Sequence, residues 1–331
     1  MKKTLIASAI AATLSVNAFA DNPQSEAADH AAQLAAKINS MPTVYGTIEL
    51  VHVSKDFDSN TTPNTHEFED NGSTIGIMHE HAISEGVTAF AKAEFEFGAD
   101  DKDSSNGIDT LDEAYIGLRG DFGSVQVGSD ETVYDWVDVL DTSEYDGLGD
   151  IDPTSFNEGD NLQYVSPVIA GGLTLGLTAP IDSDTTFGGA LAAKYAIDNL
   201  EVVLGYAIGR EEGANEEGDT IGLAATFTMD DLSLLAQYET QDEAGNADDG
   251  EDLWGLMGMY TMGQNVFALG YQSRSFDSNA KPEDEASIYV QALHNMSDNA
   301  YIYLEYLMET DVDGTADSDL DTLAVGATYK F

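Results

Sequence analysis

The chain has 331 residues and carries 61 Asp and Glu against 12 Lys and Arg, which gives a formal net charge of -49. This balance offers no basic footprint for nucleic acid, so we expect no nucleic-acid partner, and the absence of cysteine excludes a disulfide framework. Three interpretations of the acidity remain open and can coexist: a cation-attracting surface or pore, weak calcium sites, or adaptation to high salt, where self-repulsion is screened.

The first twenty residues have the pattern of a secretory signal peptide. Lys2 and Lys3 precede an apolar, Ala-rich stretch, and residues 18–20 (Ala-Phe-Ala) form a small-x-small cleavage site. We therefore expect residues 1–20 to be a signal peptide and the mature chain to begin at Asp21, in the envelope of a Gram-negative type of cell or outside it. No later apolar run is long enough to predict a transmembrane helix.

Residues 21–42 differ from the remainder of the chain. Ser25 can cap a helix that carries a narrow, weakly apolar stripe, and Pro42 marks its end. We expect a helical or mobile periplasmic segment, because chain ends are generally mobile. The alternative is a segment that docks into or under a pore as a plug.

From residue 43 onward, short stretches of alternating apolar and polar residues recur. Successive side chains of a strand point to opposite faces, so each stretch predicts a strand with one apolar face. The sixteen predicted strands are 44–54, 72–81, 86–97, 111–120, 123–129, 160–166, 171–180, 187–197, 199–209, 217–228, 231–240, 252–262, 265–275, 285–296, 299–309 and 320–331. Short turns rich in Asp, Asn and Gly alternate with long acidic connections such as 55–71, which is the pattern of outer-membrane barrels. The sequence therefore predicts an all-β fold, a sixteen-stranded antiparallel transmembrane β-barrel over residues 43–331.

The last predicted strand shows the alternation most clearly. Leu323, Val325, Ala327, Tyr329 and Phe331 fall on one face, and small or polar residues fall on the other. A soluble edge strand rarely exposes aromatic residues at its free end, whereas a strand that faces lipid places them at the membrane interface. This strand is expected to close the barrel.

Five stretches carry a family likeness in their order and spacing. They are residues 44–48 (VYGTI), 73–77 (STIGI), 114–128 (AYIGLRGDFGSVQVG), 161–167 (NLQYVSP) and 329–331 (YKF). In these stretches the chain resembles the general diffusion porins of Gram-negative outer membranes. The resemblance implies a homotrimer surrounded by membrane lipid and lipopolysaccharide, with a third long loop folded inward to narrow the pore. It also implies that Phe331 is the signal for the outer-membrane assembly machinery.

By this resemblance the inward-folded loop is about residues 130–159, which contain no Lys, Arg or His. The candidates for the pore constriction are Asp130, Glu131, Asp135, Trp136, Asp138, Asp141, Glu144 and Asp146. The candidates for the lumen-facing wall, chosen by alternation or position, are Glu49, Lys92, Glu94, Glu96, Glu113, Tyr115, Arg119 and Glu158. Family pores usually set arginines opposite such a loop, but the matching positions here are poor in basic residues. We therefore expect a nearly uniform negative field that favours cations.

The stretch 311–321 alternates Asp with other residues around a Gly, which is a loose calcium-loop pattern. Its candidate ligands are Asp311, Asp313, Asp317, Asp319 and Asp321. No Glu stands at the twelfth position of an EF-hand spacing, so a solvated acidic loop is the favoured interpretation. Apart from weakly bound calcium we expect no cofactor, and the histidines and serines form no zinc or nucleophile motif that would predict an enzyme.

The function predicted from the sequence is an outer-membrane porin that passes small hydrophilic solutes and ions passively, with a preference for cations. One alternative is a substrate-specific sugar porin, in which Trp136 and Tyr134 stack on sugar rings and residues 21–42 act as a plug. Another is a secreted acidic binding or adhesion protein.

Overall fold

The computed structural model describes residues 41–58, 63–100, 107–149, 151, 159–181, 188–209, 218–242, 250–277, 281–315 and 318–331. The predicted signal peptide, nearly all of the predicted segment 21–42, and Glu158 therefore lie outside the described residues. No helix in the described part of the chain is long and apolar enough to cross a membrane.

The described chain is built almost entirely of strands. They are β1 (Thr43–Phe57), β2 (Thr65–Asp70), β3 (Thr74–Ser84), β4 (Val87–Phe97), β5 (Ile108–Gly120), β6 (Gly123–Ser129), β7 (Asn161–Val165), β8 (Leu173–Pro180), β9 (Gly189–Ile197), β10 (Leu200–Ile208), β11 (Thr220–Met229), β12 (Leu232–Gln241), β13 (Glu251–Met262), β14 (Asn265–Phe276), β15 (Glu285–Ser297), β16 (Ala300–Thr310) and β17 (Leu320–Lys330). Two short 3-10 helices, η1 (Val133–Val137) and η2 (Val312–Gly314), lie in the connections.

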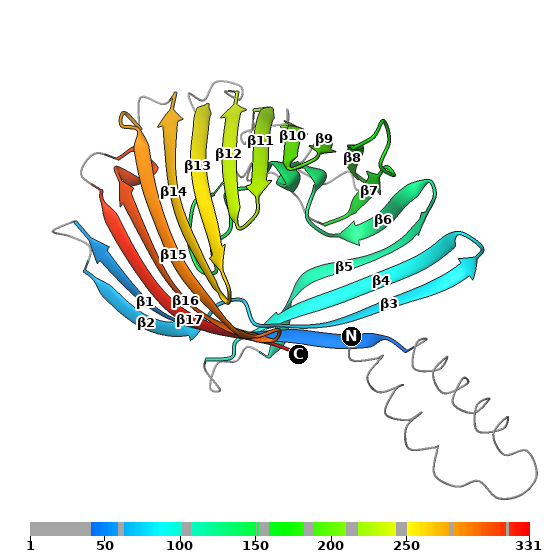
Figure 1. Cartoon of the computed structure of the whole chain (residues 1–331), viewed down its shortest axis with the longest axis horizontal. Helices are drawn as coiled ribbons and strands as arrows, with labels where there is room; N and C mark the ends of the chain where they lie inside the picture. Colours follow the sequence, from blue (N-terminus) through cyan, green and yellow to red (C-terminus); the bar gives the residue numbers. More distant parts are fainter. Residues whose placement is uncertain are drawn as a thin grey trace, which may run out of the picture.

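The strands form one closed antiparallel barrel. Apart from β2 and β3, strands that follow each other along the chain pair with each other, and β17 pairs with β1 to complete the ring, with Leu50 opposite Ala327. Figure 1 shows the ring of strands, with the C-terminus beside β1. The short hairpin turns are as predicted, and Asp198 and Asp230 open two of them in the left-handed conformation that Asp tolerates.

The seventeen strands occupy sixteen strand positions around the barrel, because β2 and β3 lie one after the other along the same partner strand, β1. β2 pairs with the second half of β1, and β3 pairs with its first half. Residues 71–73 form an interruption between β2 and β3. The sixteen-stranded barrel is therefore confirmed, but the prediction that 55–71 is a loop was wrong. The sequence of β2 is polar and acidic, so it lacks the apolar alternation of the other strands, and its pairing with β1 makes it a strand.

The two faces of the barrel wall differ as the alternation predicts. Leu204 and Leu223 lie opposite each other on β10 and β11 and are exposed, as is Leu256 on β13. Their chain neighbours Val203 and Ala224 are also paired and are buried. An exposed band of large apolar side chains is the surface that a barrel presents to lipid, so this is the outer face.

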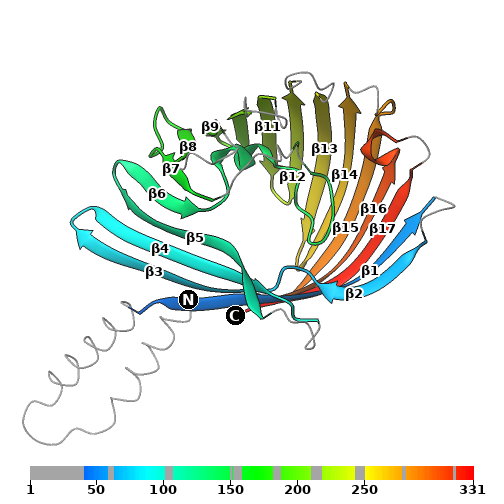
Figure 2. The same ribbon diagram turned by 180° about the vertical axis from the view of Figure 1, so that it is seen from behind.

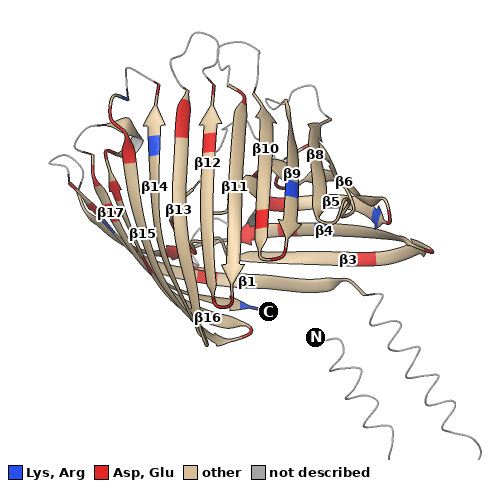
Figure 3. Ribbon diagram, turned by 45° about the horizontal axis from the view of Figure 1, so that its top comes forward, with Lys and Arg blue, Asp and Glu red and all other residues tan. Residues whose placement is uncertain are grey.

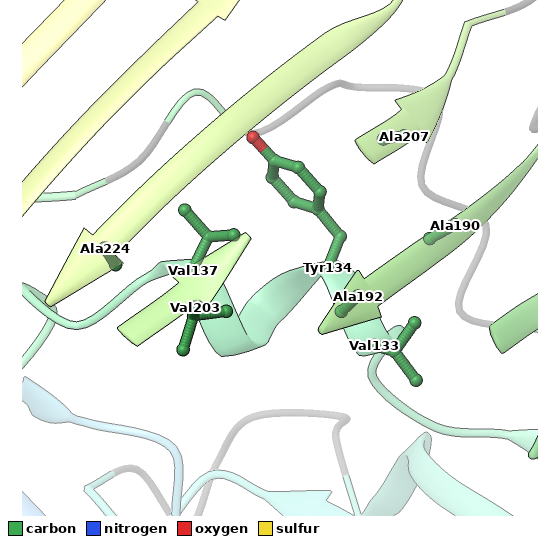
Figure 4. Packing of buried hydrophobic residues seen from close by; sticks show 8 residues of the cluster. All are labelled: Val133, Tyr134, Val137, Ala190, Ala192, Val203, Ala207 and Ala224. Carbon is green, nitrogen blue, oxygen red and sulfur yellow. The ribbon is translucent and has the colours of Figure 1, made fainter. Parts of the chain in front are cut away.

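The inner face is packed against the connection that follows β6. Buried apolar residues form three clusters, and η1 supplies Val133, Tyr134 and Val137 to the first of them (Figure 4). Leu140 and Leu148 belong to the second, on β12 to β16. Burying a side chain of this size contributes about 1.5–3 kcal/mol, so these contacts hold the connection firmly on the inner wall.

Candidate functional site

The candidate site is built around residues 130–149 and Ile151, here called the wall segment. It leaves β6 at Asp130 and passes across the inner side of β9 to β14 (Figure 2). Thr132 caps η1, because its hydroxyl oxygen accepts the backbone N–H of Tyr134 at 3.1 Å. This cap fixes the turn that directs the apolar side of η1 toward the barrel wall.

Small residues on the wall make room for η1. Tyr134 and Val137 lie over Gly205 and Gly222, where an added Cβ would come within 2.5 and 2.4 Å of a Val137 methyl group. The surrounding wall residues Ala190, Ala192 and Ala224 are also small (Figure 4). The inner wall of β9 to β11 is thus shaped to receive this helix.

Polar wall side chains bind the backbone of the wall segment along its length. The Gln237 side-chain oxygen accepts the N–H groups of Val139 and Leu140 at 3.0 and 3.2 Å. Gln272 forms a two-way pair with Gly149, accepting its N–H at 3.1 Å and donating to its carbonyl at 2.8 Å. Because these partners come from β12 and β14, the segment follows the wall closely.

Two buried glutamates hold the most distant parts of the wall segment. Glu239 on β12 is 0% exposed and accepts the Tyr134 hydroxyl at 2.5 Å and the Ile151 N–H at 3.2 Å. It therefore joins the outgoing and the returning limb. Glu305 on β16 is 2% exposed and accepts the backbone N–H groups of Glu144 and Tyr145 at 2.7 and 3.0 Å.

The opposite wall, β3 to β5, carries most of the predicted wall residues. A β-bulge in the β4–β5 pairing places Asp112 and Glu113 across from Glu94. Lys92 lies 2.5 Å from Glu113 and 3.5 Å from Glu94, so the structure brings these three predicted residues together. Tyr115 stands opposite Lys92 in register, and its ring meets the Phe90 ring edge-on.

The other predicted wall residues lie apart from this group. Arg119 pairs with Glu80 at 2.5 Å near the short-turn end of β5, and both side chains are about half exposed. Glu96 stands in register with Thr74 and Thr110. Glu49 shares the inner face of β1 with buried Val51 and Val53, beside the interruption between β2 and β3.

The predicted constriction residues divide into two groups. Asp135 and Asp138 are half-buried and Asp141 is exposed, whereas Val137 and Leu140 between them are buried; the half-buried Trp136 lies against the wall. Glu144 and Asp146 lie at the far end of the segment, where the Tyr301 hydroxyl donates to the Glu144 carboxylate. Asp130 accepts from the Gln126 side chain, Glu131 is exposed, and its carbonyl accepts from Gln163 at 2.7 Å.

Burial changes the acidity of the segment. Desolvation raises the pKa of Asp130 to about 6, and the nearby Glu113 and Glu131 add to this, while the hydrogen bond from Gln126 lowers it. Burial also raises the pKa of Glu144 and the pKa of Asp146. The charge of Asp130 is therefore expected to change around pH 6, and Glu144 and Asp146 are expected to take up a proton more readily than free carboxyl groups.

Tyr134 does not support the sugar-stacking alternative. It is 0% exposed and its hydroxyl donates to Glu239, so the suggestion that it stacks on a sugar ring was wrong. Tyr134 is a core residue because its apolar neighbours pack with it on the wall. The many acids around it in the sequence had suggested a pore-lining position instead. Trp136 packs against Gly176 of β8, with Lys194 5.0 Å from its ring.

The calcium candidates are only partly described. Asp311 precedes η2, and Asp319 accepts its backbone N–H at 3.2 Å, so these two residues close their own loop. Asp321 lies in β17 opposite Asp56, while Asp317 and the Asp313 side chain lie outside the described residues. The calcium site stays a prediction.

Sequence reasoning missed the residues that hold the wall segment. Gln237, Glu239, Gln272, Gln291 and Glu305 are all buried on the inner face. Alternation assigns them to the inner face, but nothing in the sequence states which inner residues meet water and which meet the segment.

Comparison with known proteins agrees with this architecture. The family described as Gram-negative porin matches residues 7–315. A monosaccharide porin of a Halomonas species and the major outer membrane protein of Halomonas elongata are each 28% identical, with all of both chains covered.

Solved porins share the fold. An anion-selective porin from Comamonas acidovorans has a TM-score of 0.74 at 17% identity, over 88% of this chain and 99% of that one. The trimer form of OmpT from Vibrio cholerae has a TM-score of 0.67 at 16% identity, over 88% of this chain and 99% of that one.

Proposed function

Because the chain belongs to the Gram-negative porin family, we propose that it forms a water-filled channel that prefers cations and is narrowed by the wall segment. Porins are channels rather than enzymes, and the protein is a multi-pass β-barrel of the outer membrane. The proposal concerns its selectivity and the part of the molecule that sets it.

The observation that carries the proposal is the charge on the two surfaces that face each other across the barrel. The wall segment contains no Lys or Arg, and Asp135, Asp138 and Asp141 keep more exposure than the buried Val137 and Leu140 beside them. On β4 and β5, Lys92 and Arg119 are each paired with glutamate. The acids of the segment therefore meet a surface whose basic groups are already neutralised, which favours cations.

The wider charge distribution agrees with this argument. Figure 3 shows many acidic positions and few basic ones on the described strands. Lysines do approach the wall segment: Lys55 lies 5.6 Å from the Tyr145 ring and Lys194 5.0 Å from the Trp136 ring, and Lys330 is near enough to Glu144 to lower the pKa of that carboxyl. They neutralise only part of its charge.

A planar-bilayer recording in a KCl gradient tests the proposal. We expect a reversal potential of the sign that K⁺ permeation gives, larger at ~0.1 M than at ~1 M salt, because the screening length falls from about 10 Å to about 3 Å. Replacing Asp135, Asp138 and Asp141 together by Asn keeps their shape and should move the reversal potential toward zero. An anion-selective wild type would refute the proposal, and an unchanged triple variant would assign selectivity to another surface.

A channel for monosaccharides is the second candidate, favoured by the relative of that name, which matches along its whole length. With Tyr134 buried, the half-exposed rings that could stack on a sugar include Trp136 of the wall segment and Phe90 and Tyr115 on the opposite wall. Liposome swelling with a pentose, a hexose and a disaccharide distinguishes the candidates. A sugar-specific channel shows saturation and solute-induced current block, and a general channel shows only a dependence on solute size.

A homotrimer is the assembly that we propose, because one of the similar structures is a trimer. Assembly through Phe331 and contacts with lipopolysaccharide are proposals of the same kind, supported by family membership. Migration in detergent gels before and after heating tests the trimer. A single monomer band without heating, together with a monomer mass by light scattering, would contradict it.

A further inference from the structure

We propose that His79 and His81 on β3 bind one divalent transition-metal ion, such as Zn²⁺ or Ni²⁺, on the outer face of the barrel near its short-turn end. Imidazole nitrogen is a preferred ligand of this class of metal. The site lies outside the lumen, so the inference goes beyond the proposed channel function and does not depend on its selectivity.

Both histidines point to the outer face of β3. Glu80, which stands between them in the chain, pairs with Arg119 on the inner face. Successive side chains of a strand point to opposite faces, so His79 and His81 share the outer one. The outer face of a barrel normally carries apolar side chains, so two imidazoles side by side call for a partner other than lipid.

The two imidazole rings lie next to each other and are nearly parallel. Their centroids are 6.4 Å apart, and their planes differ by 12°. A zinc–nitrogen bond is about 2.0–2.1 Å long, so an ion between the rings reaches one nitrogen of each after a small rotation of the side chains. The spacing i, i+2 fits no helical zinc motif, but on a strand it forms a chelate of two imidazoles.

The wall beside the histidines leaves room for the ion and its remaining ligands. Ala91 and Ala89 on β4 stand directly opposite His79 and His81 in the register. These small residues, with Ile116 on β5, line a hollow of about 500 Å³ whose lining includes His79. Zinc takes four ligands, so two positions are left for water or for a group from outside this chain.

The pair lies at a depth that ions in water can reach. On β9, β11 and β13 the second outward residue before the short turn is an exposed aromatic, and these residues are Tyr195, Phe227 and Tyr260. Aromatic residues in such positions mark the interface between lipid and water. His81 has the same place on β3, two residues before the exposed Ile83. A metal ion therefore reaches the pair from the water on the short-turn side.

Carboxylates elsewhere in the barrel are the competing ligands. Among the described residues, Glu94, Asp112 and Glu113 form a group whose oxygens lie within 4.8 Å of one another. The Lys92 ammonium group, 2.5 Å from Glu113, already supplies a cation there. Carboxylate oxygens suit Ca²⁺ and Mg²⁺, whereas imidazole suits Zn²⁺ and Ni²⁺, so an excess of Ca²⁺ separates the two kinds of site.

Calorimetry of the full-length protein in detergent, titrated with Ni²⁺ in a large excess of Ca²⁺, tests the site. We expect His79→Gln and His81→Gln each to lower the Ni²⁺ affinity about tenfold or more, because the second ligand of a chelate binds intramolecularly. His66→Gln is the matched control, because His66 is an exposed histidine on β2, and it should bind Ni²⁺ like the wild type. An affinity that is the same in the wild type and in both the His79 and the His81 variants would overturn the proposal.

Protection from diethyl pyrocarbonate gives a second readout that needs no substitution. The reagent modifies imidazole nitrogens that are not bound to a metal, so Zn²⁺ should abolish most of the modification of His79 and His81. The modification of His66 should be unchanged, and mass mapping of the peptides measures each histidine separately. Equal modification of His79 and His81 with and without Zn²⁺ would overturn the proposal, whether or not the variants fold.

Discussion

The inner wall of this barrel has two regions that use the same alternation for different purposes. In the described contacts, the wall segment covers β8 to β17 together with β1 and β2, where many inward residues are small, apolar or amide-bearing and where Glu239 and Glu305 are buried. On β3 to β5 the inward residues include the ion pairs of Lys92 and Arg119, beside the Phe90 and Tyr115 rings. A polar residue on the inner face is therefore not by itself a residue that lines a pore.

Glutamate shows the difference best. Glu239 on the covered wall is fully buried and is surrounded by hydrogen-bond donors. Glu80 on the opposite wall has a half-exposed side chain and a single arginine beside it. Glu239 binds the wall segment to the barrel wall, whereas Glu80 contributes to a solvated charged surface.

The largest expected effect is on stability at the covered wall. Glu239→Ala leaves the Tyr134 hydroxyl, the Ile151 N–H and the Gln237 amide without their shared acceptor. Each unsatisfied buried donor costs about 1–3 kcal/mol, so we expect the free energy of unfolding to fall by about 3 kcal/mol or more. Glu80→Ala is the matched control and should cost about 0–1 kcal/mol, as exposed ion pairs do. Urea unfolding of both variants in the same lipid or detergent measures the difference, and equal losses would remove the distinction between the two walls.

The next effect is a pH dependence of the ion selectivity, caused by Asp130 at the start of the wall segment. Asp130 has a pKa raised to about 6 by burial, so its carboxylate is charged at pH 7 and mostly neutral at pH 5. Lowering the pH through this range should therefore reduce the K⁺ preference. The reversal potential in a KCl gradient, recorded from pH 5 to 8, checks this. In Asp130→Asn the curve should be flatter over the same range, and an identical curve would assign the titration to other acids.

A smaller effect is expected at the ion pair on β5. Arg119→Gln removes a positive charge from the inner face near the short-turn end and leaves Glu80 unpaired. Cation preference should rise modestly at ~0.1 M salt and be unchanged at ~1 M, where charges act over only about 3 Å. Reversal potentials at the two salt concentrations measure this. A decrease in cation preference would show that Arg119 does not act through its charge.

The smallest effect should come from removing residues 21–40, which lie outside the described residues. The barrel closes through β1 and β17 without them, so folding and oligomer formation should be unchanged. Heat-dependent gel migration and single-channel conductance check the deletion. A truncated protein that fails to assemble would make the segment structural, and a higher conductance would support the plug.

Much of the fold was predictable from the sequence because it depends on local alternation. The period-two pattern of residues 320–331 places Leu323 and Val325 on the exposed face, where the structure has them. The acidic stretch 65–70 was missed as a strand, because it lacks an apolar face and is stabilised by its partner β1. Likewise, the group of Lys92, Glu94 and Glu113 was expected on one face, while the β-bulge that adds Asp112 opposite Glu94 was not foreseen.

By itself the sequence determined the barrel, its strand order and the excess of acids, because these follow from neighbouring residues and from composition. Only the tertiary structure decided which inner residues face the lumen and which bind the wall segment. Gln237, Glu239 and Glu305 differ from pore-lining residues through contact with a segment 88 to 161 residues away in the chain. Such pairings depend on how the closed barrel positions distant backbone N–H groups, and no local period in the sequence records them.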